Sequence, residues 1–264
     1  MPRSTPIDSA ASNGDESVTH AKMVRLTLST NLLKPFLRLS NRLQVERTDL
    51  IDLLVMRGWP AELADDEERK GIEKRAELST HILNQFAEGK ALNRFDVEKR
   101  IESPVNVTAL RMAALREADE NEVDPGEGFH RTHMGMDLLD TPEQVWEQAR
   151  GYWTAQPDAE YLIPVRLGYA PYVFRTNKWT RTKGNVRRIW ATSGDYIDVE
   201  RKLAVPLRDV DDYSKPAVLD YDAAKPANEL DLEVAAATAG RIIAFTVGAS
   251  NPVVRLRQRG HELS

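Results

Sequence analysis

Hydrophobic and polar residues alternate near the amino end of the chain, over residues 23–29. Val24, Leu26 and Leu28 fall on one side of an extended backbone, and the residues between them are polar. A period of two predicts a short strand with one buried face. Two helical patterns follow directly, so this lone strand cannot complete a core by itself and needs a strand from a partner chain.

The pattern then changes to the spacing of three and four residues that is typical of amphipathic helices. The apolar stripe of the first predicted helix comprises Leu33, Phe36, Leu39 and Leu43. After a turn at 44–46, the apolar residues of the second helix are Leu50, Ile51, Leu54 and Met56. Gly58 and Pro60 end this helix, because glycine and proline are stop signals.

Charge is distributed unevenly along a chain whose formal net charge is −5. Six basic residues and a single acid, Glu46, lie between Lys22 and Arg47, so this stretch is strongly positive. A concentrated positive field attracts a polyanion even when the protein as a whole is acidic. The strand and the two helices therefore favour a surface that faces nucleic acid.

Residues 22–59 resemble the ribbon-helix-helix family of DNA-binding proteins in their order of strand, helix, turn and helix. The resemblance implies that two chains pair their strands into an antiparallel ribbon in the major groove. The residues that it places at base edges are Arg25 and Thr27, with Met23 or Lys22 at the rim. It also places the start of the second helix, at Arg47 and Thr48, against a phosphate, where helix amides favour an anion.

Two residues depart from the family pattern. Glu46 stands where that family has a small hydroxyl residue, and a carboxylate beside a phosphate is unfavourable. Pro35 lies beyond the first helical turn, where it removes a hydrogen bond and kinks the chain. The alternative interpretation is an ordinary strand and two amphipathic helices within an α/β core.

The whole pattern predicts an α+β fold with several segments. In order they are a disordered tail at 1–20, the DNA-binding and dimerisation segment at 21–60, a helical segment at 61–118, a linker at 119–128 and a β-rich domain at 129–264. The helical segment ends in strong helix formers at 108–119. The linker is acidic and contains Pro125 and Gly126.

The β-rich domain is predicted to be a curved sheet or a small barrel. Thr141, Pro142 and Gln144 mark a helix start, with a hydroxyl cap and proline at the first position. A second helix is predicted at 230–239. Strand patterns comprise two strands within 161–174 joined near Gly168, and single strands at 188–192, 196–199, 241–247 and 252–256.

A second basic cluster lies in this domain and contains no acid. It consists of Arg175, Lys178, Trp179, Arg181, Lys183, Arg187 and Arg188. Cations beside aromatic side chains suit a phosphate backbone with stacked bases. The alternative is a solvated hairpin whose tryptophans belong to the core. A similarity to PUA-like base-recognition domains is carried by Arg150-Gly-Tyr-Trp153, Tyr161, Gly168, Trp179 and Asn251-Pro252.

Candidate catalytic and metal-binding residues are few. Asp195, Glu200 and Lys202 form an acid followed by Glu-x-Lys, with which some nucleases hold Mg²⁺. Surface charge pairing explains these three residues as well. His130 and His133 have a spacing found in zinc sites, although no helix is predicted to hold it. The chain has no cysteine, which excludes thiolate ligands and disulfides, and we expect no cofactor.

Together these patterns favour a dimeric, sequence-specific DNA-binding protein, a prokaryotic transcription regulator of the repressor type. Its expected partners are DNA and a second copy of the chain. Its apolar runs are too short to cross a membrane, and a chain without cysteine fits a cytoplasmic location. Two alternatives stay open: a Mg²⁺-dependent nuclease or other nucleic-acid-processing protein with its active site in the β-rich domain, and a non-catalytic protein that only dimerises through 22–59.

Overall fold

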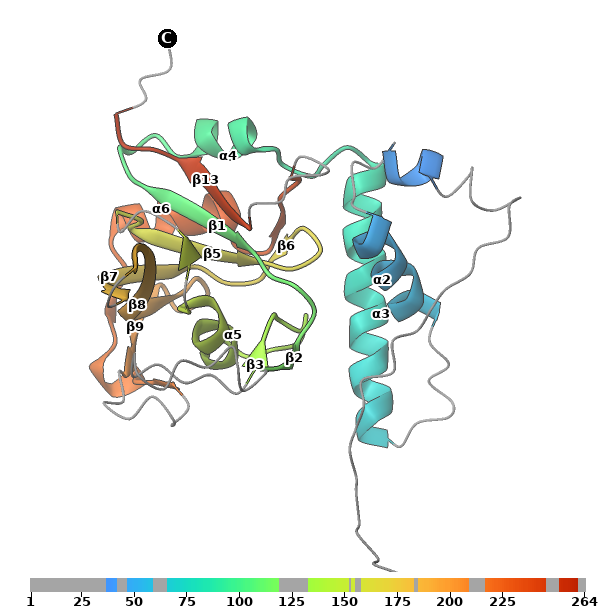
Figure 1. The fold of residues 1–264 in the computed structure, drawn as a ribbon, viewed down its shortest axis with the longest axis horizontal. Helices are drawn as coiled ribbons and strands as arrows, with labels where there is room; N and C mark the ends of the chain where they lie inside the picture. The colour runs from blue at the N-terminus through green and yellow to red at the C-terminus, as the bar shows by residue number, and fades with distance from the viewer. Residues whose placement is uncertain are drawn as a thin grey trace, which may run out of the picture.

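A computed structural model shows a helical flank beside a β-rich body, so the predicted α+β class is confirmed (Figure 1). It describes residues 37–41, 47–58, 66–118, 133–151, 153–154, 158–182, 185–208, 217–245 and 252–260. The tail at 1–20, the strand predicted at 23–29 and the linker at 119–128 lie outside these residues. Residues 37–41 are helical, as predicted for the first amphipathic helix.

Most helices form where the sequence pattern predicts them. They are α2 (Arg47–Gly58), α3 (Asp66–Ala87), α4 (Arg94–Arg100), α5 (Pro142–Ala149) and α6 (Glu229–Thr238), with a 3₁₀ helix at Tyr221–Ala223. Reciprocal caps begin α4, α5 and α6 at Asn93, Thr141 and Asn228, where each cap side chain accepts from the third helical amide. Within the described part of the chain, no helix is long and apolar enough to cross a membrane.

The β-rich body is built on a nine-stranded sheet of order β10-β9-β8-β7-β5-β1-β13, with β11 on β9 and β4 on β8. Neighbouring strands are antiparallel except for β1 and β5, which are parallel. Two small ribbons, β2–β3 and β6–β12, are added. The strands are β1 (Val107–Arg111), β2 (Arg116–Glu117), β3 (His133–Met134), β4 (Trp153–Thr154), β5 (Tyr161–Val165), β6 (Tyr169–Ala170), β7 (Phe174–Thr182), β8 (Asn185–Asp198), β9 (Leu203–Arg208), β10 (Val218–Leu219), β11 (Lys225–Pro226), β12 (Arg241–Ile242) and β13 (Val253–Arg257).

The helix predicted at 108–119 is wrong, because residues 107–111 form strand β1. This strand lies between β5 and β13, and its residues Val107, Ala109 and Leu110 are at most 1% exposed. Pairing with a strand on each edge outweighs helix propensity, because ordinary residue types differ in helix propensity by only about 0.7 kcal/mol per residue or less. The end of the predicted helical segment thus belongs to the same sheet as the β-rich domain.

The strands predicted at 188–192 and 196–199 are also one continuous strand, β8. Gly194 lies between them without breaking the strand. A Cβ at this position would lie below contact distance of the Trp146 ring and 2.7 Å from the Arg175 carbonyl oxygen. The glycine therefore permits close packing, whereas Gly168 supplies the predicted turn after β5, with φ of 84°.

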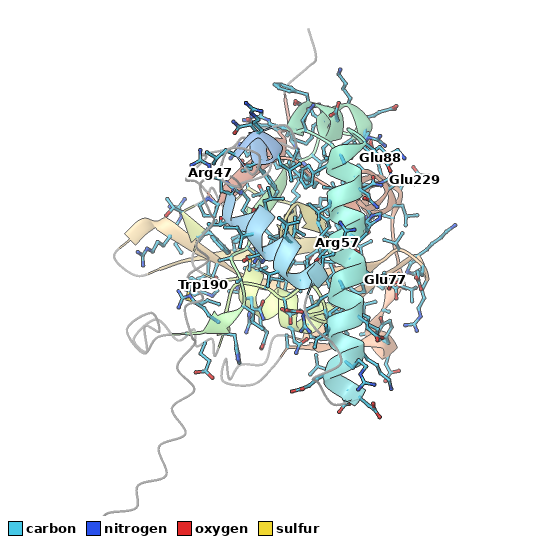
Figure 2. All side chains as sticks on the ribbon, turned by 90° about the vertical axis from the view of Figure 1, so that its right-hand side faces the viewer. Arg47, Arg57, Glu77, Glu88, Trp190 and Glu229 are labelled. Carbon is cyan, nitrogen blue, oxygen red and sulfur yellow. The ribbon has the colours of Figure 1, made fainter. Side chains whose placement is uncertain are left out.

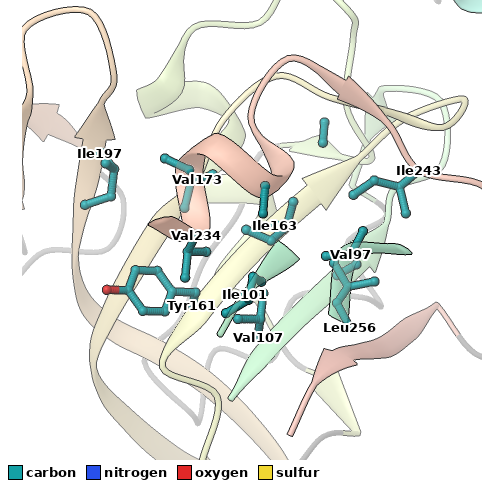
Figure 3. Packing of buried hydrophobic residues seen from close by; sticks show 14 of the residues in the cluster. Val97, Ile101, Val107, Tyr161, Ile163, Val173, Ile197, Val234, Ile243 and Leu256 are labelled. Atoms are coloured by element: carbon teal, nitrogen blue, oxygen red, sulfur yellow. The ribbon is translucent and has the colours of Figure 1, made fainter. Parts of the chain in front are cut away.

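Apolar side chains from α4, α6 and the sheet form the largest core cluster (Figure 3). Val97 of α4, Ile101 at its carboxyl cap and Val234 of α6 pack against Val107 of β1 and Ile163 of β5. All five side chains are at most 1% exposed. The sheet is therefore covered on this face by two helices whose starts the capping residues determine.

A second cluster covers the opposite face of the sheet under α5. Leu162 belongs to this cluster and its neighbour Ile163 to the first, as expected when successive strand residues point to opposite faces. Trp146 of α5 packs on Phe174 of β7, with ring centroids 5.3 Å apart. The β-rich body thus has one helical layer on each side of its sheet.

The helices α2 and α3 pack side by side on one flank of this body (Figure 1). Leu50 and Leu53 of α2 are fully buried, in a cluster with Ile82 of α3 and with Leu167 and Ile242 of the body. Burial of two leucines contributes roughly 3–6 kcal/mol. The flank is therefore joined to the body by apolar packing that α2 itself supplies.

Ion pairs reinforce the same junction. Arg166, in the turn after β5, is 4% exposed, and its guanidinium lies 2.6 Å from Asp52 and 3.5 Å from Asp49 of α2. Arg75 of α3 lies 3.1 Å from Asp137 of the body. These contacts fix the direction in which α2 points from the body.

Candidate nucleic-acid interface

The amino end of α2 is the part of the ribbon-helix-helix pattern that the structure describes. Arg47 and Thr48 are its first two residues, and both side chains are exposed. Figure 2 labels Arg47 at this end of the helix. The first amides of a helix have no acceptor within the helix, and the helix dipole makes this end attractive to anions. An exposed cation at such a helix start suits contact with a phosphate.

Asp49 places a negative charge in the same helical turn. Its carboxylate is paired with the buried guanidinium of Arg166, which also holds Asp52. An opposite charge at this distance partly neutralises the carboxylate. Arg47 is thus the exposed cation of this turn, while Lys22, Arg25 and Thr27 lie outside the described residues.

The second basic cluster lies on the long hairpin formed by β7 and β8. Lys178, Arg181 and Arg188 are exposed along it. Lys183 and the side chain of Arg187 lie outside what the structure describes. The hairpin therefore presents at least three cations to solvent from two adjacent strands.

The tryptophans of this hairpin are packed into the protein. Trp190 is 6% exposed (Figure 2). Trp179 is half-buried against the cluster under α5, and its indole nitrogen donates to the Ala159 carbonyl at 2.8 Å. Trp190 is therefore not open for stacking on a base, and the charged residues exposed on the described part of the hairpin are cationic.

Arg175 begins the predicted cluster, but two carboxylates bind its guanidinium, and its side chain is 29% exposed. Its Nη1 donates to both carboxylate oxygens of Asp231, at 3.1 and 2.9 Å, and its Nε and Nη2 donate to Asp195. Asp231 is fully buried and also accepts from the Tyr161 hydroxyl at 2.6 Å. Every guanidinium nitrogen of Arg175 is therefore engaged, and the group links β5, β7, β8 and α6.

The charge states of this network follow from burial and pairing. Burial raises the pKa of Tyr161, and its hydrogen bond to Asp231 raises the pKa further, so the hydroxyl stays protonated and donates. Burial acts to lower the pKa of Arg175, but the hydrogen bond to Asp195 and the charges of Asp231 and Asp195 together raise it. A permanent cation thus faces the two carboxylates, and the network stabilises the fold.

The three candidate nuclease residues are spread along the β8–β9 hairpin. Asp195 lies opposite Arg175 and also accepts from the Asn177 amide at 3.1 Å. Glu200 and Lys202 are exposed in the turn that follows β8. At about 3.3 Å per residue, roughly 10 Å of strand separates Asp195 from the start of that turn. The structure does not bring the three side chains together around one ion.

The candidate zinc pair is only half described. His133 is exposed on β3, and His130 lies outside the described residues. Across the described ranges, no three His, Cys, Asp or Glu side chains are grouped so that they could hold a metal ion.

Sequence reasoning did not single out Asp231 or Arg166, and it named Tyr161 only as part of the PUA-like similarity. Asn228 and Asp231 form a capping box, so a local signal existed for the helix start but not for the pairing with Arg175, which is 56 residues away. Arg166 lies within an apolar strand segment and has no local signal. Its acidic partners in α2 precede it by more than a hundred residues.

No protein family, curated protein or solved structure matches this chain. Its function is therefore inferred from its own side chains. In the described part of the chain, the surfaces that suit a polyanion are the start of α2 and the β7–β8 hairpin.

Proposed function

We propose that this protein is a dimeric, sequence-specific DNA-binding protein of the ribbon-helix-helix type that acts as a transcriptional repressor. The observation that carries the proposal is the start of α2 at exposed Arg47 and Thr48, where the resemblance places a phosphate contact. Because α2 is anchored by Leu50 and Leu53, this end has a defined position on the surface.

The mechanism follows from the ribbon. In the strand that the sequence predicts at 23–29, Arg25 and Thr27 alternate with Val24 and Leu26, so the proposal has them point outward when the apolar face is buried. Arginine donates two hydrogen bonds to guanine, and threonine contacts a base edge or a thymine methyl. A twofold dimer reads two half-sites, and its occupancy of the operator blocks polymerase.

A second apolar face of α2 supports the dimer. Leu54 and Val55 are 40% and 37% exposed, although Leu50 and Leu53 on the same helix are fully buried. Ile51 precedes Leu54 by three residues and Val55 by four, so these three share one face. A helix that is apolar on two faces is typical of one packed between two layers, and the second copy supplies the second layer.

We therefore expect Leu54→Asp to convert the dimer into a monomer, because the charge would be buried at the interface. Light scattering measures the molar mass. The control is Val218→Asp on β10, where the native side chain is 55% exposed and far from α2 in the chain. A wild-type protein that is monomeric at high concentration contradicts the dimer.

The DNA proposal is tested by comparing arginine variants on a selected operator and on random duplex. Arg25→Ala is expected to cost about 1–3 kcal/mol on the operator and to relax base preference. Arg47→Ala is expected to weaken binding to all sequences alike and to reduce the salt slope by about one, because it contacts phosphate. Fluorescence anisotropy at several salt concentrations measures both effects.

Arg57→Ala is the matched control, since Arg57 is an exposed arginine at the opposite end of α2 (Figure 2). It is expected to bind as the wild type does. If Arg25→Ala and Arg47→Ala also leave both affinities unchanged, the ribbon assignment is wrong. Mg²⁺-dependent cleavage lost in Glu200→Ala would indicate a nuclease, and dimerisation without DNA affinity would indicate an interaction protein.

A further inference from the structure

A cavity of about 730 Å³ lies where the helical flank joins the β-rich body. Its walls come from the carboxyl end of α3, the turn into α4, α4 itself and the turn between α6 and β12. Figure 1 shows α4 above the sheet, where the chain leaves α3. This volume is in the range of sites that hold small molecules.

Positive charge dominates the lining of this cavity. Lys90, Lys99, Arg100 and Arg241 line it, whereas its acidic lining is Asp96. The Asp96 carboxylate already accepts from the Asn93 amide at 2.9 Å as part of the α4 cap. The cavity therefore has a net positive charge contributed by three separate parts of the chain.

Three of these cations have no acidic partner within the described residues. Lys90 lies 2.6 Å from Glu88, but no described carboxylate is within ion-pair distance of Lys99, Arg100 or Arg241. Like charges gathered around one cavity repel one another unless an anion lies between them. Lysine and arginine both bind phosphate, arginine through paired donors.

The walls are fixed by backbone hydrogen bonds. The Leu92 amide donates to the Ile242 carbonyl at 2.8 Å, and the Ala244 amide donates to the Leu92 carbonyl at 2.7 Å. Ile242 is buried beneath the cavity. The segment that carries Lys90 and the segment that carries Arg241 are thus joined, so the positive lining is preorganised for a ligand.

An exposed aromatic side chain, Phe95, directly precedes Asp96 of the lining and is not itself part of the lining. Phe95 is 65% exposed, which is unusual for a phenylalanine. It precedes Lys99 by four residues on α4, so the two side chains share one helical face. A flat ring beside phosphate-binding cations suits a ligand that carries both a phosphate group and a planar ring.

We propose that this cavity binds a small molecule with a diphosphate group and a planar ring, of the nucleoside diphosphate class. Lys99, Arg100 and Arg241 hold the diphosphate, and Phe95 contacts the ring. The limited volume of about 730 Å³ and the adjacent Glu88 favour a small ligand over an extended polyanion such as DNA. The site is separate from α2, so it does not depend on the proposed DNA-binding function.

Isothermal titration calorimetry of the full chain with pyrophosphate and with ADP tests this site. Both probes are expected to bind saturably at one site per chain. The double variant Arg100→Gln with Arg241→Gln is expected to bind each probe roughly tenfold or more weakly, because charged hydrogen bonds to the phosphates are lost. Arg94→Gln is the matched control, an exposed arginine on α4 that does not line the cavity, and it should bind both probes like the wild type.

Phe95→Ala separates the ring contact from the phosphate contact. This variant is expected to weaken the binding of ADP by roughly fivefold or more and to leave the binding of pyrophosphate unchanged. Circular dichroism checks that each variant is folded. Absence of saturable binding by the wild type, or an equal loss in Arg94→Gln, overturns the site. If duplex DNA binding, and not probe binding, is lost in the double variant, the small-molecule assignment is wrong.

Discussion

Replacing Asp231 with alanine is expected to lower the free energy of unfolding by about 3–5 kcal/mol, because it leaves a partly buried guanidinium without one of its carboxylates. Asp231 is fully buried and accepts from Arg175 and from the Tyr161 hydroxyl. It also accepts from the Asn228 amide in the cap of α6. Urea unfolding followed by circular dichroism measures the loss.

Two variants test the physical reason for this loss. Asp222→Ala, at an exposed residue of the 3₁₀ helix, removes the same side chain and is expected to change stability by less than about 0.5 kcal/mol. Tyr161→Phe removes a single hydrogen bond and is expected to cost about 1 kcal/mol. Equal losses for Tyr161→Phe and Asp231→Ala would contradict the central position of Asp231.

Removing both acids that face Arg166 is expected to have the second largest effect. Asp49→Ala with Asp52→Ala leaves a guanidinium in a site that is 4% exposed, without a carboxylate. We expect the free energy of unfolding to fall by about 3 kcal/mol. This is the lower end of the range for broken buried ion pairs, because the side chains of the two acids are themselves 28% and 41% exposed. Urea unfolding measures the cost, and trypsin cleavage after Arg57 reports release of α2.

Adding Arg166→Met to this double variant is the decisive comparison. A methionine buries no charge, so most of the lost stability is expected to return. A triple variant as unstable as the double variant would show that packing, and not the unpaired charge, causes the loss. The same variants connect the fold to the proposed function, because the direction of α2 sets the position of Arg47.

The local sequence pattern was sufficient to predict the elements whose capping residues and apolar periodicity indicate the same structure. The start of α5 follows from Thr141, Pro142 and Gln144, and α3 lies within the segment predicted to be helical at 61–118. These features act between residues three or four apart, so the sequence contains them directly. The turn at Gly168 is of the same kind.

Local pattern failed where distant segments pair. Residues 107–111 favour a helix by propensity, yet they form β1 because β5 and β13 pair with both of its edges. The strand across Gly194 was divided in two for a similar reason, since only the Trp146 ring packed against it explains the glycine. The strands that pair with β1 and the tryptophan that packs on Gly194 are all distant in sequence, so neither effect has a local signal.

The basic cluster on the β7–β8 hairpin shows the same difference between what the local sequence predicts and what distant contacts decide. The charges of Lys178, Arg181 and Arg188 are evident in the sequence, and all three are exposed. Arg175 has the same charge but lies against Asp195 and Asp231. Composition counts a cation, whereas only the fold decides whether a protein carboxylate has already bound it.

The sequence by itself determined the α+β class, most helices and the strong positive charge between Lys22 and Arg47. Only the tertiary structure decided that β1 is a strand, that two carboxylates bind Arg175, and that Lys99, Arg100 and Arg241 surround one cavity. The physical reason is the range of the interactions involved. Caps and periodicity act within one or two turns, whereas burial, ion pairing and cavity formation depend on residues that folding alone brings together.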